Sequence, residues 1–328
     1  MGVGTVSRVL NGSAHVSPAT RQRVLAAIRR LEFRPHAQAR RILRRRAEMV
    51  CFLLSNRDFL HTFHARILQG VETYARTLKQ HVVFLVVHYS GGTPAERIPL
   101  PPLLEERGWV DGLILAGTIW PNFLRRIETL HLPFVALGNN VVGLDGQRDF
   151  DQVTFDGFKG EFQATRHVIE SGHRRVTFVA DVSYPWFRER YEGYLAAMGL
   201  SRLPPTALTE RRPPNYLHYG EWAASRLLAS KPRPTVIMAG NDEIAYGLWR
   251  SFRRLGVRVP DDVSLVGFDD REEALLMDPP LTTVRVPKEQ IGQACMAMLL
   301  ERLQHPNMPF TERVLATDLV ERETLRRL

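Results

Sequence analysis

Arginine is concentrated at the start of the chain. The first 48 residues hold eleven arginines against two acidic residues, Glu32 and Glu48, so this segment carries the whole net charge of +9. A guanidinium group can bind a phosphate or a guanine edge through two hydrogen bonds, and each neutralised phosphate releases counterions. The block therefore favours a nucleic-acid partner; a solvated basic arm and a membrane-surface segment are the alternatives.

Motifs for catalysis are missing from the sequence. It has no G-x-S-x-G elbow, no phosphate-binding loop, no dinucleotide fingerprint and no metal-ligand spacing among its 11 histidines. Cys51 and Cys295 stand beside apolar residues, so we expect two buried, inert thiols and neither a disulfide framework nor a metal site. The sequence does not favour an enzyme, and we expect no cofactor.

Two short helices and a linker must position the arginines. Apolar residues recur at helical spacing over residues 4–11. A second helix is predicted from the N-cap Ser17, with Pro18 in its first turn, to about Leu31. Residues 36–46 are an arginine-dense linker that we expect to become helical on contact with its partner.

From Met49 onward, short β-branched runs alternate with amphipathic stretches. Strands are predicted at 49–55, 82–88, 111–116, 133–138, 174–181, 234–240 and 263–268, with helices near 63–79, 120–130, 187–199, 218–229 and 241–255. This alternation is typical of a parallel sheet covered by helices on both faces, and it occurs twice. We therefore predict two similar α/β lobes with a ligand site in the cleft between them.

Several motifs occur together in the order of one known family. Residues 5–11, Thr-Val-Ser-Arg-Val-Leu-Asn, resemble the recognition helix of a helix-turn-helix, and residues 35–42, Pro-His-Ala-Gln-Ala-Arg-Arg-Ile, resemble a hinge. Further matching motifs stand at 110–114, 170–175, 190–194, 241–245, 256–260, 266–270 and 280–284. Over essentially its whole length the sequence is similar to the LacI/GalR family of bacterial transcription regulators.

The resemblance implies a core of two doubly wound parallel-sheet lobes of the periplasmic-binding-protein type, behind a partial all-α helix-turn-helix headpiece. We expect the headpiece and hinge over 1–48, the first lobe over 49–155 plus about 285–312, and the second lobe over 156–284 plus about 313–328. An effector in the cleft would change the angle between the lobes. In a homodimer this would alter the spacing of the headpieces on a near-palindromic operator.

The resemblance also implies which residues meet DNA. The headpiece helix would present Thr5, Ser7 and Arg8 to the major groove. The hinge would enter the minor groove with Ile42 as an apolar wedge, while Arg40, Arg41 and Arg44 meet phosphates. Ile42 replaces the family's leucine, and His36 replaces the hinge asparagine, so the local hydrogen bond of that asparagine is in doubt.

A sugar-like ligand needs a few fixed polar groups and an apolar wall for its ring faces. By the resemblance, the ligand-binding set is Arg190, Asn241 and Asp269, with Phe63 and His64 at the start of the first core helix and Trp186 and Arg188 in the loop before Arg190. The structural alternatives are a helix cap for Asn241, a salt bridge for Arg190 and plain core for Phe63. We expect that the change Asp269→Ala weakens ligand binding and leaves the fold intact.

The family's first headpiece helix has no counterpart before Met1. The codon GTG encodes valine and also starts bacterial genes. A start site placed too far downstream would therefore put Met1 at a position where the family has valine. The alternative is a natural protein that lacks this helix. A chain of that second kind could be a stand-alone sugar-binding protein without a DNA role. The DNA upstream of the Met1 codon would distinguish them. Without a signal-peptide pattern or a membrane-length apolar run, we expect a cytoplasmic protein.

Overall fold

The computed structural model describes residues 3–10, 15–31, 47–57, 62–106, 108–144, 148–211 and 215–328. The chain divides into two units, Met1–Ala47 and Glu48–Leu328. The hinge residues named above, Arg40, Arg41, Ile42 and Arg44, lie outside the described residues, as does His36. The predictions made for them therefore stay predictions.

The first unit contains the two predicted helices, α1 (Val3–Leu10) and α2 (Pro18–Arg30). The Ser17 hydroxyl accepts a hydrogen bond from the Thr20 backbone N–H at 3.3 Å, and Pro18 occupies the first helical turn, which explains why α2 begins there. Val9 of α1 and Val24 of α2 are the buried apolar residues of this pair. The predicted helix–turn–helix order is confirmed.

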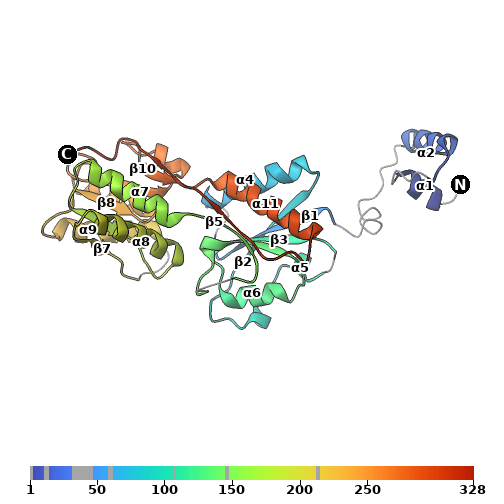
Figure 1. The fold of residues 1–328 in the computed structure, drawn as a ribbon, viewed down its shortest axis with the longest axis horizontal. Helices are drawn as coiled ribbons and strands as arrows, with labels where there is room; N and C mark the ends of the chain where they lie inside the picture. The colour runs from blue at the N-terminus through green and yellow to red at the C-terminus, as the bar shows by residue number, and fades with distance from the viewer. Residues whose placement is uncertain are drawn as a thin grey trace. The chain divides into compact units, whose positions relative to one another are not determined.

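The second unit contains two lobes, seen in Figure 1 at the two ends of the core. The first lobe has a sheet of order β11-β5-β4-β3-β1-β2 in which every pair of strands is parallel. Its strands are β1 (Met49–Ser55), β2 (His81–Val87), β3 (Gly112–Gly117), β4 (Phe134–Leu137), β5 (Asp151–Phe155) and β11 (Glu312–Leu315). Helices α4 (Thr62–Thr77), α5 (Pro102–Glu105), α6 (Pro121–Glu128) and α11 (Lys288–Gln304) cover it.

Alternation along β1 shows why this sheet is covered on both faces. Phe52 and Leu54 belong to a buried cluster with residues of α4 and α11. Cys51 and Leu53 point the other way, into a separate cluster with residues of α5 and α6. Figure 1 shows α6 on the opposite side of the sheet from α4 and α11. A strand that is apolar at every position except its last, Ser55, requires two covered faces, as predicted.

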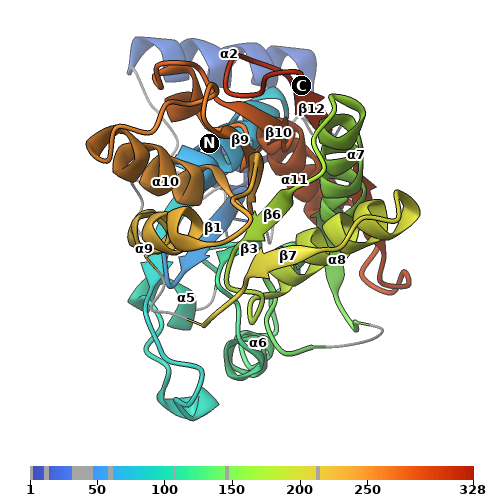
Figure 2. The same cartoon turned by 90° about the vertical axis from the view of Figure 1, so that its left-hand side faces the viewer.

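The second lobe repeats the design with the sheet order β12-β10-β9-β8-β6-β7. Its strands are β6 (Val176–Val179), β7 (Thr206–Leu208), β8 (Val236–Ala239), β9 (Ser264–Asp269), β10 (Thr282–Arg285) and β12 (Asp318–Val320), the last antiparallel to β10. The helices are α7 (Gly157–Glu170), α8 (Pro185–Leu200), α9 (Tyr216–Ala229) and α10 (Asp242–Arg254), visible around the sheet in Figure 2. Two parallel-sheet lobes are therefore confirmed.

The chain passes between the lobes three times: after β5, after β10 and after β11. The second passage follows Arg285, close to the predicted position. We placed the third near residue 312, but Glu312–Leu315 pairs in parallel with β5 of the first lobe. The third passage therefore follows Leu315, because β11 completes the edge of the first sheet before the chain leaves it.

Glycines allow α4 and α11 to cross closely. A Cβ at Gly70 of α4 would meet the backbone carbonyl of Glu289, and a Cβ at Gly292 of α11 would meet that of Ile67. We expect Gly70→Ala to lower the free energy of unfolding by about 1–3 kcal/mol, because the helices must separate. Gly199→Ala, at a helical site with nothing within 4 Å of the added carbon, is the control and should be neutral or stabilising in urea unfolding. Equal behaviour of both variants would contradict this account.

Candidate effector site

An inner compartment of about 40 Å³ lies between the lobes. Its lining includes six of the seven predicted ligand residues, namely Phe63, His64, Trp186, Arg190, Asn241 and Asp269, together with Arg57, Asn140, Phe155 and Tyr216. Phe63 and His64 stand at the start of α4, whereas Asn241 and Asp269 follow β8 and end β9. Phe63 and His64 thus meet residues that stand 122 to 206 positions later in the sequence, because parallel strands place their carboxyl ends at one edge.

Arg190 and Asp269 form a buried ion pair across this compartment. The Arg190 guanidinium lies 3.0 Å from an Asp269 carboxylate oxygen, and the residues are only 3% and 6% exposed. The guanidinium also donates to the Gly240 carbonyl and stacks over the Phe268 ring, 3.8 Å from its centroid. The salt bridge that we considered as the structural alternative is therefore present, and Asp269 itself is the partner.

The backbone of Asp269 is strained. Its φ is +116°, a region that residues with a side chain rarely adopt. Such a conformation costs about 1–3 kcal/mol and persists only where the surroundings hold it. Here the Lys288 ammonium group donates to the Asp269 carbonyl at 2.6 Å, and Arg190 holds the carboxylate. Strain at this position is consistent with a carboxylate that is aimed at a ligand.

Asn241 and Asp242 make different hydrogen bonds at the start of α10. The Asn241 side-chain oxygen caps the helix by accepting from the Ile244 N–H at 2.9 Å, which leaves its amide nitrogen for a ligand. Asp242 is fully buried and accepts hydrogen bonds from the Arg271 N–H at 2.7 Å and the Thr283 hydroxyl at 2.6 Å. Asp242 therefore braces the turn, whereas Asn241 both caps the helix and lines the compartment.

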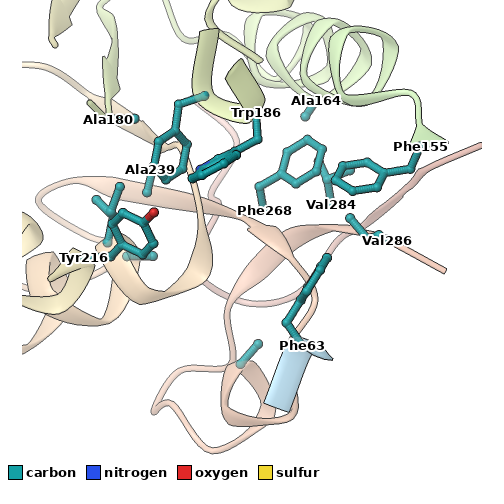
Figure 3. Close-up of a cluster of buried hydrophobic side chains, with 14 of the residues drawn as sticks. Phe63, Phe155, Ala164, Ala180, Trp186, Tyr216, Ala239, Phe268, Val284 and Val286 are labelled. Carbon is teal, nitrogen blue, oxygen red and sulfur yellow. The ribbon is translucent and has the colours of Figure 1, made fainter. Parts of the chain in front are cut away.

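Aromatic side chains from both lobes converge here. Figure 3 shows Phe155, Phe268 and Trp186 gathered on one side and Phe63 projecting from α4 on the other. Phe63 makes an edge-on contact with the His64 ring, with the centroids 5.3 Å apart. Of these rings, Phe63, Phe155 and Trp186 line the inner compartment, whereas Phe268 is buried behind it.

Arg188 does not line the inner compartment. Pro185 begins α8, so Trp186 and Arg188 lie in its first turns rather than in a loop. The helical period places Trp186 and Arg190 on the buried face and turns Arg188 to the surface, where it donates to the Val182 carbonyl at 3.4 Å. Arg188 therefore leaves the candidate set.

Sequence reasoning missed four residues of the inner compartment. Arg57, Asn140 and Phe155 each stand at or just beyond the carboxyl end of a strand of the first sheet. The rule that ligands bind at those ends would have pointed to them. Tyr216 opens α9 instead, after the three-residue strand β7, and no pattern in the sequence marks it.

An outer compartment of about 770 Å³ adjoins the inner one and shares Arg57 and Tyr216 with it. Tyr89, Trp120 and Tyr184 contribute aromatic surface, and the polar lining includes Asn56, Asn215, Glu243 and Arg271. This volume lies in the range of about 300–1,000 Å³ that is typical of small-molecule sites. The inner compartment is nearly filled by its own side chains, so the outer one offers the room for a ring.

Glu161 lies buried beneath the site on α7, with the Thr165 hydroxyl donating to its carboxylate at 3.3 Å. Desolvation raises its pKa to about 8, against the lowering effect of Arg190 and that hydrogen bond. A carboxyl group with a raised pKa in the folded state binds a proton that the unfolded chain has lost. Stability is therefore present below the unfolded pKa and falls as pH rises toward 8.

We accordingly expect the free energy of unfolding to decrease between pH 5 and pH 8. Glu161→Gln should reduce this decrease, since the amide stays neutral. Part of the slope should remain, because burial also raises the pKa of Asp242 to about 8. Urea unfolding of the wild type and of Glu161→Gln at several pH values measures how the free energy of unfolding depends on pH. An unchanged slope in the variant would show that Glu161 does not ionise in this range.

The other functional candidates belong to the first unit. Arg8 is exposed on α1 and Thr5 is half-buried, while the side chain of Ser7 lies outside the described residues. Within the described part of the chain, no group of three or more metal-ligating side chains gathers. No helix there is long and apolar enough to cross a membrane.

Comparison with known proteins matches both units. Residues 2–36 match the model of the bacterial regulatory proteins of the lacI family, and residues 165–325 match the periplasmic binding protein-like domain. The HTH-type transcriptional regulator CelR of Thermobifida fusca is 31% identical over 336 residues, which covers 99% of this chain and 95% of that protein. This relative spans both units.

Solved structures agree with the sequence matches. A complex of the transcriptional regulator CelR with cellobiose is 30% identical, with a TM-score of 0.72 and coverage of 99% of this chain and 96% of that one. The lac repressor dimer bound to operator, at 24% identity, shares the fold with a TM-score of 0.80 over 98% of this chain and 95% of that one. The chain belongs to the LacI family of bacterial transcription regulators.

Proposed function

We propose that this protein is a transcription regulator that binds a specific operator through its headpiece and hinge and responds to a small sugar-type effector between the lobes. One observation carries the proposal: two helices of a partial DNA-binding headpiece and a polar, aromatic-lined compartment occur on one chain. The relatives named as repressors, such as the ribose operon repressor of Haemophilus influenzae, support a repressing role. The proposed role requires no catalysis and places the protein with DNA in the cytoplasm.

The residues proposed to hold the effector are Arg190, Asn241 and Asp269, with Phe63, His64 and Trp186 as the wall. Fixed donors and acceptors grip hydroxyl pairs, and aromatic faces cover the ring. The similar CelR structure contains cellobiose, which supports a carbohydrate as the ligand class here.

Coupling between the effector and DNA follows from the three inter-lobe passages. An effector that contacts both lobes favours one angle between them and so biases an equilibrium between two arrangements. We propose a homodimer in which this angle sets the spacing of the two headpieces on a near-palindromic site. Thr5, Ser7 and Arg8 would read base edges, while Ile42 and Arg40, Arg41 and Arg44 would serve the hinge.

Fluorescence anisotropy with the promoter DNA beside the gene tests the proposal. The full chain should bind this duplex more tightly than a scrambled one of equal length, and a sugar that raises its thermal stability should shift the affinity for the promoter alone. Arg8→Ala should weaken promoter binding, whereas Arg166→Ala, an exposed arginine on α7, serves as the control. Sugar binding without any preference for promoter DNA would favour a stand-alone sensor instead.

A further inference from the structure

Arg57 stands at the junction of the two compartments and lines both. It follows β1 of the first lobe, and its guanidinium donates to the Tyr216 hydroxyl of the second lobe at 2.9 Å. The guanidinium also faces the rings of Trp186 and Tyr216, 5.6 and 5.3 Å from their centroids. A cation is thus held by aromatic rings and one phenol at the centre of the cleft.

The charges that line the compartments leave Arg57 without a matching carboxylate. Asp269 is paired with Arg190 at 3.0 Å, and Glu243 is paired with Arg271 at 2.5 Å. Within the part of the chain that the structure describes, no carboxylate oxygen lies within 4.0 Å of the Arg57 guanidinium. Among the described lining residues, Arg57 is therefore a positive charge without a directly paired carboxylate, although Arg271 nearby is paired with both Glu243 and Glu273.

The hydrogen-bonding capacity of Arg57 is also incomplete. A guanidinium group has five N–H donors, and the described structure uses one of them, toward Tyr216. Its buried Nε has no hydrogen-bond partner there. A cation withdrawn from water without an opposite charge is unfavourable, whereas a carboxylate or phosphate can accept two parallel hydrogen bonds from the same fork.

We propose that the effector is an acidic sugar derivative whose carboxylate or phosphate binds Arg57. The ring would lie where the two compartments meet, between Trp120 and Tyr184 of the outer compartment and the polar groups of the inner one, and its anionic group would bind Arg57, which lines both. This inference rests on the proposed function, since it names the chemical class of the effector of that same site. A neutral sugar could pack against the aromatic side chains but would give the Arg57 guanidinium no opposite charge.

Calorimetric titration of the full chain with matched ligands tests this. The probes are glucose against glucuronate, galactose against galacturonate, and glucose against glucose 6-phosphate, so the carboxylate and phosphate arms are separate. We expect at least one acidic member to bind about tenfold or more tightly than its neutral partner, the scale of a hydrogen bond to a charged group. Arg57→Gln should abolish that difference, and Arg57→Lys should keep part of it.

Arg76→Gln, an exposed arginine on α4, is the matched control and should retain the wild-type preference. Far-UV circular dichroism shows whether each variant folds, and the comparison of acidic with neutral ligands on the wild type needs no variant. Equal binding of acidic and neutral partners, or a preference that survives in Arg57→Gln, overturns the inference and leaves the sugar site standing. If none of these ligands and no other sugar binds, the proposed sugar site fails with it.

Discussion

Asp269→Ala is expected to lower the free energy of unfolding by about 3–5 kcal/mol, because it strands the buried Arg190 guanidinium without its counter-charge. That is a large part of the roughly 5–15 kcal/mol that holds an ordinary domain folded. The sequence alone led us to expect an intact fold after this change, which stays a prediction; the buried pair with Arg190, which the sequence does not reveal, predicts a large loss of stability instead. Urea unfolding of the variant measures the loss.

A control and a conservative variant separate stability from binding. Asp262→Ala removes a carboxylate of the same lobe whose ion pair with Arg258 is exposed to solvent, so it should cost much less stability than Asp269→Ala. Asp269→Asn also removes the counter-charge of Arg190 but keeps the size and an acceptor oxygen for it, so we expect a smaller loss of stability than in Asp269→Ala and a sugar affinity that falls about tenfold or more. A stable Asp269→Ala protein with unchanged affinity would remove Asp269 from both roles.

Arg302→Ala should lower the free energy of unfolding as much as Asp269→Ala does. It should leave ligand binding at the effector site unchanged. The guanidinium pairs with Asp151 at 2.7 Å, both residues are at most 6% exposed, and further N–H groups bind the carbonyls of Pro306, Met308 and Pro309. Its loss leaves a buried carboxylate and frees the segment that leads into β11. We expect about 3–5 kcal/mol of destabilisation in urea unfolding.

The double variant Asp151→Ala with Arg302→Ala sharpens this test. Because it removes both charges, it should be destabilised by less than the sum of the single changes. Arg302 lines neither compartment, so at a temperature where the variant is folded its sugar affinity should equal that of the wild type. Additive losses would show that the two residues act independently.

The sequence predicted the elements with strong periodicity. All seven predicted strands and five core helices are present within a few residues of the predicted bounds, since β-branched runs and amphipathic stripes are local signals. It did not predict α5, β5, α7, β7, β10, α11, β11 and β12. Helix α11 is buried over most of its circumference and has only a narrow polar stripe of Gln290, Gln293, Glu301 and Gln304, and β7 and β12 are three residues long.

The residues of the candidate site were likewise predicted only in part from the sequence. Arg190, Asn241 and Asp269 could be named because they stand in motifs that resemble a family, but their pairing is a tertiary fact. Arg57 lies in no motif, and its importance follows from the absence of a carboxylate near it within the described chain. A sequence cannot give that information, because it depends on which charges the fold brings together.

The three passages between the lobes also set the order in which the protein can be completed during synthesis. The first lobe needs α11 and β11, which come near the end of the chain, to cover α4 and to finish its sheet. The strands and helices of the second lobe, other than β12, are all made before that. On the ribosome, the second lobe can therefore assemble most of its core while the first still exposes Ile67 and Val71 of α4, although the first lobe begins earlier in the chain.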